Sequence, residues 1–456
     1  MSDVEALMWT LEKDPFLSSA FANLTTFDRV PDLDRLLRRM ERAVRAVPRL
    51  RQRVVASFGR FAPPGWYDDP DFDLRYHVRR VDLPPPGNRA QLLDLAARLA
   101  SDPFDRTRPL WEFVVVGGLE DGRGAMVQRM HHTITDGEGG VRLSLHFLDA
   151  ERDAPEPAPP ESGDGPEPHR RSLAGDVADA VGHNVRRQFG IARRAATEAA
   201  GVATDPGRLL RAPAEVVAGT SSLLRQAVVR DERRSPLWTR RSLRHRVEVG
   251  AVPFDDVKRA AKSLGGSIND VFVCAAAGAA GAYHRARGVD VAELRMAMPV
   301  STRQDRTAGG NAFTPARLLV PVRLDPVERF AAIHGRLSDV KGERALSLAA
   351  PLAGVMNLLP TSLLVQTARR QVETVDFTTS NVRGAPFPLY IAGARIEHNH
   401  PLGPLGGTAF NLTTLSYNGS LDLGLHVDEA AVDDAAELMR LIEDAFVELF
   451  DTASAI

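Results

Sequence analysis

The residues in this sequence whose types and spacing best suit chemistry are two adjacent histidines with an aspartate and a glycine nearby. They are His131 and His132, followed after three residues by Asp136 and Gly137. A histidine side chain exchanges protons near neutral pH, so either ring is a candidate general base. Successive side chains of a strand point to opposite faces. We therefore expect the two rings to diverge and only one of them to face a substrate.

The segments on either side of these residues predict how they are held. Residues 125–130 are typical of a strand, and residues 141–149 have the apolar spacing of an amphipathic helix. Asp136 and the glycines after it suit a turn and the start of that helix. A strand, a polar turn and a helix together commonly hold a reactive group at the edge of a sheet.

Two other interpretations of the histidine pair are weaker. Adjacent histidines alone are compatible with an ordinary surface loop, but the full pattern arises by chance in roughly one chain in a thousand of this length. A metal site is disfavoured because neighbouring residues on an extended segment do not readily share one ion. The sequence also lacks His-Glu-x-x-His and Cys-x-x-Cys motifs.

Motifs of several common enzyme classes are absent from the sequence. There is no Gly-x-Ser-x-Gly of a serine hydrolase and no Gly-x-x-x-x-Gly-Lys-[Ser/Thr] of a P-loop enzyme. No Gly-x-Gly-x-x-Gly follows a predicted strand, so a dinucleotide site is unsupported. What remains is a histidine-based site that needs no bound cofactor.

Composition narrows the class of protein further. The chain has 456 residues, of which 44% are hydrophobic and 25% charged, with a formal net charge of -2. These values are typical of a globular protein with a large core and argue against a nucleic-acid partner. Cys274 is the single cysteine, so no internal disulfide can form, and we interpret its apolar surroundings as core packing. The N-terminus lacks the pattern of a signal peptide, and we expect a cytoplasmic protein.

Changes of composition along the chain predict three parts. Residues 1–150 form a first unit, residues 151–246 a Pro-rich linker and Arg-rich helical crossover, and residues 247–456 a second unit. Predicted strands cover 76–81, 111–116, 125–130, 294–300, 318–322, 374–382 and 408–417. Predicted helices cover 32–44, 91–100, 141–149, 253–264, 267–285 and 431–451. Residues 345–368 carry no charge, but Pro351 and Pro360 interrupt them, which favours broken helices over a membrane span.

With its flanks, the histidine motif resembles the bacterial wax ester synthase/diacylglycerol acyltransferase family of the chloramphenicol acetyltransferase-like superfamily. The resemblance runs almost from end to end. The segments that carry it are Pro48–Arg53, Pro109–Trp111, His131–His132 with Asp136–Gly137, Asn269–Asp270, Pro299–Arg303, Gly310–Asn311, Ser380–Val382 and Ser416–Gly419. The family's Asn-Val-Pro-Gly-Pro is here Asn381-Val382-Arg383-Gly384-Ala385, without either proline. This difference bears on the shape of the loop, and so on acceptor or acyl preference, more than on the reaction.

The resemblance implies an α/β fold of two chloramphenicol acetyltransferase-like subdomains, each a mixed β-sheet flanked by helices, with a tunnel at their interface. It also implies transfer of a long-chain fatty acyl group from acyl-CoA to diacylglycerol or a fatty alcohol, with acyl-CoA as a substrate and no cofactor. His132 would be the general base, without a covalent intermediate, and Asp136 would hold the loop. Arg303 is the candidate partner of Asp136.

Further residues are assigned through the same resemblance. Asn269 and Asp270 are similar to a second functional motif of the family, although a helix N-cap explains them as well. Candidate substrate-binding or structural residues in the second half are Arg303, Asn311, Ser380 and Asn381.

Two other classes of function stay open. One is a condensation-type acyltransferase that uses another alcohol or amine acceptor or a carrier-bound acyl donor, although no carrier domain is evident. The other is a non-catalytic lipid-binding protein, against which the intact His132 and Asp136 argue. Since the expected substrates reside in lipid, we also expect peripheral association with the inner membrane or lipid droplets, helped by the Arg-rich crossover.

Overall fold

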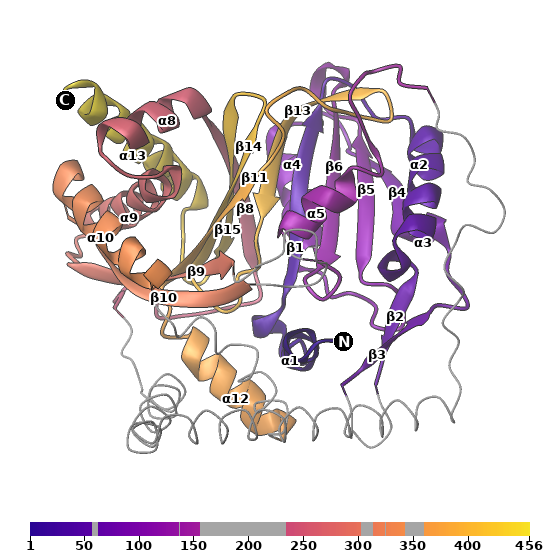
Figure 1. Ribbon diagram of the computed structural model, residues 1–456, viewed down its shortest axis with the longest axis horizontal. Coiled ribbons are helices and arrows are strands. Elements are labelled where there is room, and N and C mark those ends of the chain that lie inside the picture. The colour runs from indigo at the N-terminus through magenta and orange to yellow at the C-terminus, as the bar shows by residue number, and fades with distance from the viewer. Residues whose placement is uncertain (57–62, 136, 156–233, 302–312, 324, 343–359) are drawn as a thin grey trace, which may run out of the picture.

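Two mixed β-sheets, each with its own helices, stand side by side in the computed structural model (Figure 1). The structure describes residues 1–56, 63–135, 137–155, 234–301, 313–323, 325–342 and 360–456. We call the part around the sheet that holds the histidine motif the first lobe, and the part around the other sheet the second lobe. Two α/β lobes of this kind confirm the predicted fold class.

The first sheet contains seven of the described strands, in the order β4-β5-β6-β1-β13-β12-β7. Their bounds are β1 (Ala20–Phe27), β4 (Val78–Asp82), β5 (Trp111–Gly117), β6 (Gly124–His131), β7 (Leu148–Asp149), β12 (Tyr390–Ile391) and β13 (Ala394–Leu402). Strands β4 and β5 are parallel, and the other neighbours are antiparallel. The strand that ends at the first motif histidine, β6, is therefore held in register from both sides by β1 and β5.

Helices cover both faces of the first sheet. They are α1 (Asp3–Leu11), α2 (Leu33–Ala46), α3 (Leu74–His77), α4 (Arg89–Ser101) and α5 (Gly137–Ser144), with 3-10 turns at Pro15–Leu17, Pro48–Leu50 and Glu120–Gly122. Met126 and Met130 of β6 pack in the cluster that includes α2, whereas Ala125 and Val127 pack in the cluster that includes α4. By the same alternation, the side chain of His131 lies on the α4 side of the sheet.

The second sheet contains six of the described strands, in the order β10-β9-β11-β14-β15-β8. Their bounds are β8 (His245–Pro253), β9 (Glu293–Ser301), β10 (Phe313–Pro321), β11 (Phe377–Arg383), β14 (Phe410–Tyr417) and β15 (Ser420–Asp428). Strand β11 is parallel to both of its neighbours, which makes this sheet mixed as well. A separate ribbon in the first lobe pairs β2 (Gln52–Val55) with β3 (Gly65–Asp68).

One large apolar cluster lies between the second sheet and its helices, on the left of Figure 1. The helices that enclose this cluster are α8 (Phe254–Ser263), α9 (Ile268–Ala286), α10 (Pro326–Gly342) and α13 (Ala435–Ser454). Helix α12 (Thr361–Val372), which precedes β11, instead packs against α1 and the 3-10 turn Pro15–Leu17. Helix α9 is rich in alanine and glycine, so neighbouring helices approach it closely. Cys274 lies fully buried on this helix, as its apolar surroundings predict.

A strand from late in the sequence ties the two lobes together. Strand β13 pairs with β1 in the first sheet and also packs against β14 and β15 of the second sheet. The approach is so close that a Cβ atom at Gly424 of β15 would overlap the carbonyl oxygen of Pro401. We call this contact the seam. The first sheet thus includes residues far beyond 150, and the predicted domain boundaries 1–150, 151–246 and 247–456 stay a prediction.

Most predicted elements are present, with two corrections. The helix predicted over 141–149 begins earlier, at Gly137, and ends at Ser144, because residues 148–149 join the first sheet as β7. The strand predicted over 76–81 begins only at Val78, because Asp73 caps the short helix α3 before it. The structure also contains elements that were not predicted, among them β1, β13, β15 and α10.

Some predicted features fall where the structure says little. Most of the Arg-rich crossover lies outside the described residues, and so does the charge-free run up to residue 359. Among the described residues, no single helix has the length and apolar composition to cross a membrane, although α8 and α9, bent by 97°, have both when taken together. Helix α9 lies in the apolar cluster of the second lobe.

Candidate active site

The two motif histidines lie at the end of β6, in a tight turn. The turn is closed by the N–H of Ile134, which donates to the carbonyl oxygen of His131 at 2.9 Å. On either side, the N–H of His131 donates to Leu110 O at 3.0 Å and the N–H of His132 to Ser19 O at 3.1 Å. The backbone of the pair is therefore fixed by the segments that enter β5 and β1.

His131 is buried, with 1% of its surface exposed, and both of its ring nitrogens have partners. The N–H of Thr133 donates to Nδ1 at 3.1 Å, and the Thr133 hydroxyl lies 2.8 Å from the same atom. Because a backbone N–H can only donate, Nδ1 must carry no proton in the neutral ring. Nε2 then carries the proton and donates it to Glu12 Oε2 at 3.1 Å.

Glu12 lies just after α1 and is the charged partner of His131. Burial raises the pKa of this carboxyl, but hydrogen bonds from His131, Ser18 and Ser19 outweigh burial and leave the pKa of Glu12 below its ordinary value. The side chain is therefore a carboxylate at neutral pH. The motif sequence contains no signal for this residue, since Glu12 precedes it by 119 positions.

His132 follows the last residue of β6 and differs from its neighbour in its surroundings. Its side chain is half-buried, and its ring centroid lies 4.6 Å from that of Phe21, with the planes tilted by 38°. The two rings thus occupy different environments. Since β6 ends at His131 and His132 belongs to the turn, the alternation of strand side chains that we used in the prediction is not the cause. Asp136 lies outside the described residues, and Gly137 begins α5, as expected of a helix start.

An arginine from another segment of the family resemblance braces this turn. Arg49 donates to the carbonyl oxygen of Thr133 at 3.1 Å and to Glu5 Oε1 at 3.3 Å. Its guanidinium also lies 4.3 Å from the ring centroid of Trp66. Arg49, in the segment Pro48–Arg53, therefore holds the turn in place through Thr133. The sequence alone does not reveal this role.

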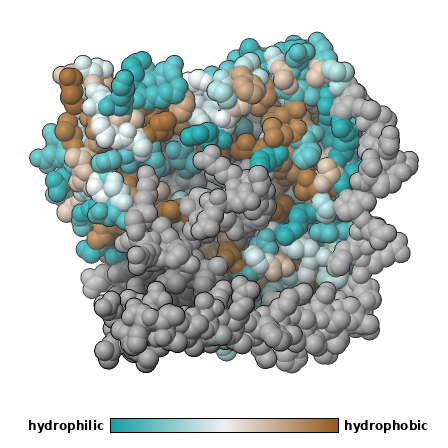
Figure 2. Space-filling view, in the orientation of Figure 1, coloured by the Kyte–Doolittle hydropathy of each residue, from teal (hydrophilic) through white to brown (hydrophobic). Residues whose placement is uncertain are grey.

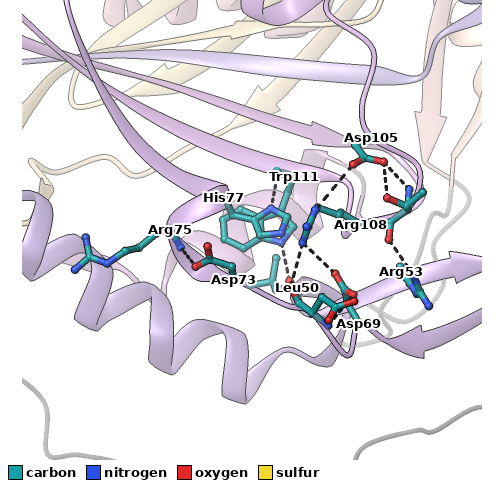
Figure 3. A network of polar contacts seen from close by, with 11 residues as sticks. Leu50, Arg53, Asp69, Asp73, Arg75, His77, Asp105, Arg108 and Trp111 are labelled. Atoms are coloured by element: carbon teal, nitrogen blue, oxygen red, sulfur yellow. Dashed lines mark hydrogen bonds and ion pairs between the residues drawn. The ribbon is translucent and has the colours of Figure 1, made fainter.

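Trp111, from the segment Pro109–Trp111, connects β5 to the 3-10 turn Pro48–Leu50 and to His77 (Figure 3). Its indole N–H donates to Leu50 O at 2.7 Å. His77 Nδ1–H donates to Trp111 O at 2.7 Å, and the two rings stack with centroids 4.6 Å apart. Burial lowers the pKa of His77, so this ring is neutral and structural. This network holds the start of β5 in place. Leu110, the residue before β5, accepts the N–H of His131 at its carbonyl oxygen.

The second lobe approaches the motif through the ends of β11 and β14. Helix α5 lies against β11 in the middle of Figure 1. Ile134 and Leu143 of the motif side share an apolar cluster with Leu415 and Tyr417, against which Val382 also packs. We call this contact the front edge. Figure 2 shows hydrophobic residues over the part of this face that carries α5.

Ser380 and Asn381 lie on β11, the strand at the front edge. Ser380 is half-buried and Asn381 is exposed. Asn381 Oδ1 accepts a hydrogen bond from the Thr414 hydroxyl at 3.2 Å, which leaves its amide nitrogen as a donor for another partner. Among the predicted second-half residues that the structure describes, these two lie on the strand that contacts α5.

The segment Asn381–Ala385, which departs from the family pattern, begins within β11, and this strand ends at Arg383. The N–H of Gly384 then donates to Ser416 O at 3.0 Å. A Cβ atom at Gly384 would lie 2.5 Å from that carbonyl oxygen, so only glycine fits. The neighbouring segment Ser416–Gly419 forms the β14–β15 turn, where Asn418 and Gly419 have φ of 44° and 86°.

Asn269 and Asp270 are at the start of α9, away from the front edge. Ser267 is the N-cap, and Asp270 completes a capping box by accepting from the Ser267 N–H at 2.6 Å. Asp270 Oδ2 also accepts from His334 Nδ1 of α10 at 2.9 Å. The N-cap that the sequence suggested for Asn269 and Asp270 is instead Ser267, and Asp270 contributes to capping from the third helical position. Arg303 and Asn311 lie outside the described residues.

A groove of about 380 Å³ opens at the seam, behind β13. Arg89, Glu248, His398, His400 and Glu443 are among the residues that line it. The predicted tunnel at the interface stays a prediction, since the groove does not define one. Within the described part of the chain, no three His, Cys, Asp or Glu side chains are grouped so as to hold a metal ion.

The arrangement offers acid–base chemistry at one ring. His131 is engaged on both nitrogens, and the adjacent His132 lies in a braced turn that leads into α5, the helix that contacts β11 of the second lobe. A base in this position can take a proton from a hydroxyl group bound between the lobes. Apolar side chains nearby suit a substrate with hydrocarbon chains.

Comparison with known proteins finds family models that match most of the chain. The family model described as the wax ester synthase/diacylglycerol acyltransferase catalytic domain matches residues 1–272, and the model of the family's C-terminal domain matches residues 309–450. A Mycobacterium tuberculosis protein named as a candidate diacylglycerol O-acyltransferase is 34% identical over 99% of this chain and 92% of its own length.

Two solved structures have the same fold. The wax ester synthase/diacylglycerol acyltransferase from Marinobacter aquaeolei VT8 superposes with a TM-score of 0.64 at 22% identity, covering 99% of this chain and 98% of that one. A starter condensation domain of rhizomide synthetase, solved in complex with C8-CoA and Leu-SNAC, has a TM-score of 0.59 at 16% identity, covering 100% and 94% of the two chains.

Proposed function

The chain belongs to the wax ester synthase/diacylglycerol acyltransferase family and is therefore an acyltransferase, and we propose that it moves a long-chain fatty acyl group from acyl-CoA to diacylglycerol or a fatty alcohol. The observation that supports this proposal is the difference between the surroundings of the two motif histidines. His131 is occupied on both ring nitrogens, while His132 lies half-buried in the turn that precedes α5, the helix that contacts β11 of the second lobe.

In the proposed reaction His132 is the general base. It accepts the hydroxyl proton of the acceptor while the acceptor oxygen forms a bond to the thioester carbonyl carbon. The carbon–sulfur bond then breaks, and His132 returns the proton to the sulfur of CoA. The products are triacylglycerol or a wax ester and free CoA, with no covalent enzyme intermediate and no cofactor.

The tetrahedral intermediate needs hydrogen-bond donors already in place. We propose the hydroxyl of Ser380 as such a donor, because Ser380 lies on the same face of β11 as Val382, which packs against the cluster that contains Ile134 and Leu143. Asn381 lies on the opposite face of the strand and is proposed as a substrate-binding or structural residue. Asp136 would hold the loop after the turn, with Arg303 as its partner. Asn311 is kept as a further substrate-binding candidate.

Acceptor choice is the part of the proposal that this chain's own sequence affects most. Arg383 and Ala385 replace the two prolines of the family pattern in the loop beside Ser416. An alcohol other than diacylglycerol, or an amine in a condensation-type reaction, is therefore the second candidate acceptor. The loop follows β11 of the second lobe, and Ala385 packs against the apolar cluster that includes Ile134 and Leu143, so the two replacements act on the surroundings of the motif and leave the histidine pair itself unchanged.

One assay tests the reaction and the acceptor together. The purified protein would be given radiolabelled palmitoyl-CoA with hexadecanol, diacylglycerol or an alkylamine, and the lipid products separated. We expect labelled triacylglycerol or wax ester, absent with His132→Ala. Labelled amide alone would favour the condensation-type reaction, and tight binding of the lipid without turnover would favour a non-catalytic lipid-binding protein.

We also propose that the protein meets its substrates at a membrane or lipid-droplet surface, without a spanning helix. Leu145, after α5, is 70% exposed, and Phe387, in the loop after β11, is 53% exposed. Apolar side chains on the rim of a site can enter a lipid interface. Flotation with anionic liposomes at low and high salt tests this; failure to float at low salt would contradict it.

A further inference from the structure

We propose that Glu12 is a positioning residue for acyl transfer, which fixes both the tautomer of His131 and the backbone that presents His132. The inference rests on the proposed role of His132 as the base. Glu12 is neither in the histidine motif nor in the segments that carry the family resemblance. Its importance follows from three hydrogen bonds around one largely buried carboxylate.

The carboxylate of Glu12 is fully engaged. Its Oε1 accepts from the Ser18 hydroxyl at 2.6 Å, and its Oε2 accepts from the Ser19 N–H at 2.8 Å and from His131 Nε2 at 3.1 Å. The side chain is 15% exposed and that of His131 is 1% exposed. A charged acceptor shielded from water in this way makes stronger hydrogen bonds than a neutral one.

The first consequence is that His131 has one tautomer. The N–H of Thr133 donates to Nδ1, so a proton on Nδ1 would face another proton and break this contact. The same change would leave Glu12 facing an Nε2 without a hydrogen. The carboxylate and the Thr133 N–H therefore select the same tautomer from opposite sides of the ring, and the ring holds Thr133 in the turn.

The second consequence concerns His132 directly. Ser19 donates its N–H to Glu12 and accepts the N–H of His132 at its carbonyl oxygen, at 3.1 Å. Glu12 is thus linked to the first histidine through its ring and to the second through one residue, Ser19. Losing the carboxylate would loosen both contacts at the turn. A displacement of the base by about 1 Å is enough to cost about 100-fold in rate.

The same segment offers a matched control. Asp14 lies two residues further on and is also an acidic side chain in a structural role. It accepts from Arg369 of α12 at 3.2 Å and from the N–H of Phe16 at 3.1 Å. An Asp14→Ala variant therefore perturbs the anchoring of this segment to α12, whereas Glu12→Ala removes the bond to the motif.

The experiment compares the purified full-length chain with Glu12→Ala, Glu12→Gln and Asp14→Ala. We expect Glu12→Ala to lower kcat by about 10- to 100-fold with KM for palmitoyl-CoA nearly unchanged, because the base is displaced and the substrate contacts are not. Glutamine still offers one acceptor oxygen, so Glu12→Gln should recover most of the rate. Asp14→Ala should stay within about threefold of the wild type.

A spectroscopic readout separates positioning from general destabilisation. Nitrogen-15 NMR of histidine-labelled protein, assigned with a His131→Gln sample, should report a protonated Nε2 and an unprotonated Nδ1 for His131. Glu12→Ala should mix the two tautomers, and Glu12→Gln should keep the wild-type pattern. An unchanged tautomer in an impaired Glu12→Ala protein, or an equal loss of kcat in Asp14→Ala, would overturn the proposal.

A double-mutant cycle completes the test. If Glu12 acts partly through the ring of His131, removing it from a His131→Gln protein should cost less than removing it from the wild type. Fully additive losses would contradict the ring route. If the wild type itself transfers no acyl group, the proposed function fails, while the NMR measurement still decides whether Glu12 sets the tautomer.

Discussion

The front edge and the seam, two of the places where the lobes meet, differ in chemistry. At the front edge α5 lies against β11, and Ile134, Leu143, Leu415 and Tyr417 belong to one apolar cluster. The seam contains a buried polar network whose centre is Asp422, with 0% exposure, and Leu402 of β13 also shares an apolar cluster with Val247 and Val249 of β8. Substrate chemistry is proposed for the first surface only.

Asp422 shows how the seam is held. It accepts from His398 Nδ1 at 3.0 Å, from the Asn399 N–H at 2.7 Å and from the Ser420 hydroxyl at 2.7 Å. Nearby, His400 Nδ1–H donates to Leu423 O at 3.1 Å. A satisfied buried network fixes geometry strongly, whereas apolar contacts tolerate changes of shape. The difference indicates that the seam sets how the lobes are placed, and that the front edge is where substrate preference varies.

The largest expected effect comes from the front edge and leaves the seam untouched. His132→Ala should lower kcat by about 100- to 10,000-fold, the range typical of a lost general base, because no other group accepts the acceptor proton. The melting temperature should change little, since His132 is only half-buried. Acyl transfer from palmitoyl-CoA and thermal unfolding would be measured on the same preparation. Near-normal turnover of a folded His132→Ala protein would rule out the assignment.

The second effect comes from the seam and should leave the chemistry untouched. Asp422→Ala strands the Asn399 N–H and the Ser420 hydroxyl and should lower the free energy of unfolding by about 1–3 kcal/mol. Activity per folded molecule at low temperature should stay near that of the wild type. If kcat instead fell with little change in stability, the seam would be part of the catalytic machinery.

The sequence predicted elements of the front edge but not the seam. At the front edge, local patterns predicted the strand before His131 and the turn, and the family resemblance supplied Ser380 and Asn381. The seam was missed, because β13 carries polar residues such as His398 and Asn399 and has no apolar periodicity. Its partner β1 lies about 370 residues earlier in the chain, and such pairing leaves no local signal.

The same limit explains why the residues that hold the histidine motif in place were not predicted. Glu12 could not be paired with His131 from the sequence, since the bond joins the end of a helix to the end of a distant strand. Arg49 lies in a segment that the family resemblance includes, but its contact with Thr133 depends on how β2 and β6 are placed. Residues 145–149 show the opposite case. Their sequence predicts a helix, but residues 148–149 form β7, because pairing with β12 overrides the local preference.

A third test sharpens the claim that the front edge sets substrate preference. Arg383→Pro with Ala385→Pro would restore the family pattern in the loop after β11. Because proline removes an N–H and fixes φ, we expect the ratio of activity with diacylglycerol to that with hexadecanol to change by about three- to tenfold. Competition assays with both acceptors would measure the ratio, and Arg383→Ala with Ala385 unchanged is the matched control. An unchanged ratio would mean that acceptor preference is set elsewhere.

The smallest effects separate two seam histidines by the sign of their pH dependence. The hydrogen bond to Asp422 raises the pKa of His398 above its ordinary value of 6.5. Its stabilising contribution is therefore fully present below pH 6.5 and is lost as the pH rises through the raised pKa. Burial instead lowers the pKa of His400 to about 4, so its contribution is present above pH 6.5 and is lost as the pH falls toward 4.

Chemical denaturation as a function of pH tests this contrast. Relative to the wild type, His398→Gln should lose more stability at about pH 6 than at about pH 9, because the protonated ring binds Asp422 more tightly than the neutral one. His400→Gln should remove part of the loss of stability between pH 6.5 and 4, since glutamine has no proton to gain. His398 is about half exposed, so solvent screens its effect and makes it the weaker of the two. Parallel pH curves for His398→Gln and the wild type would show that the bond to Asp422 adds no proton-linked stability to the seam.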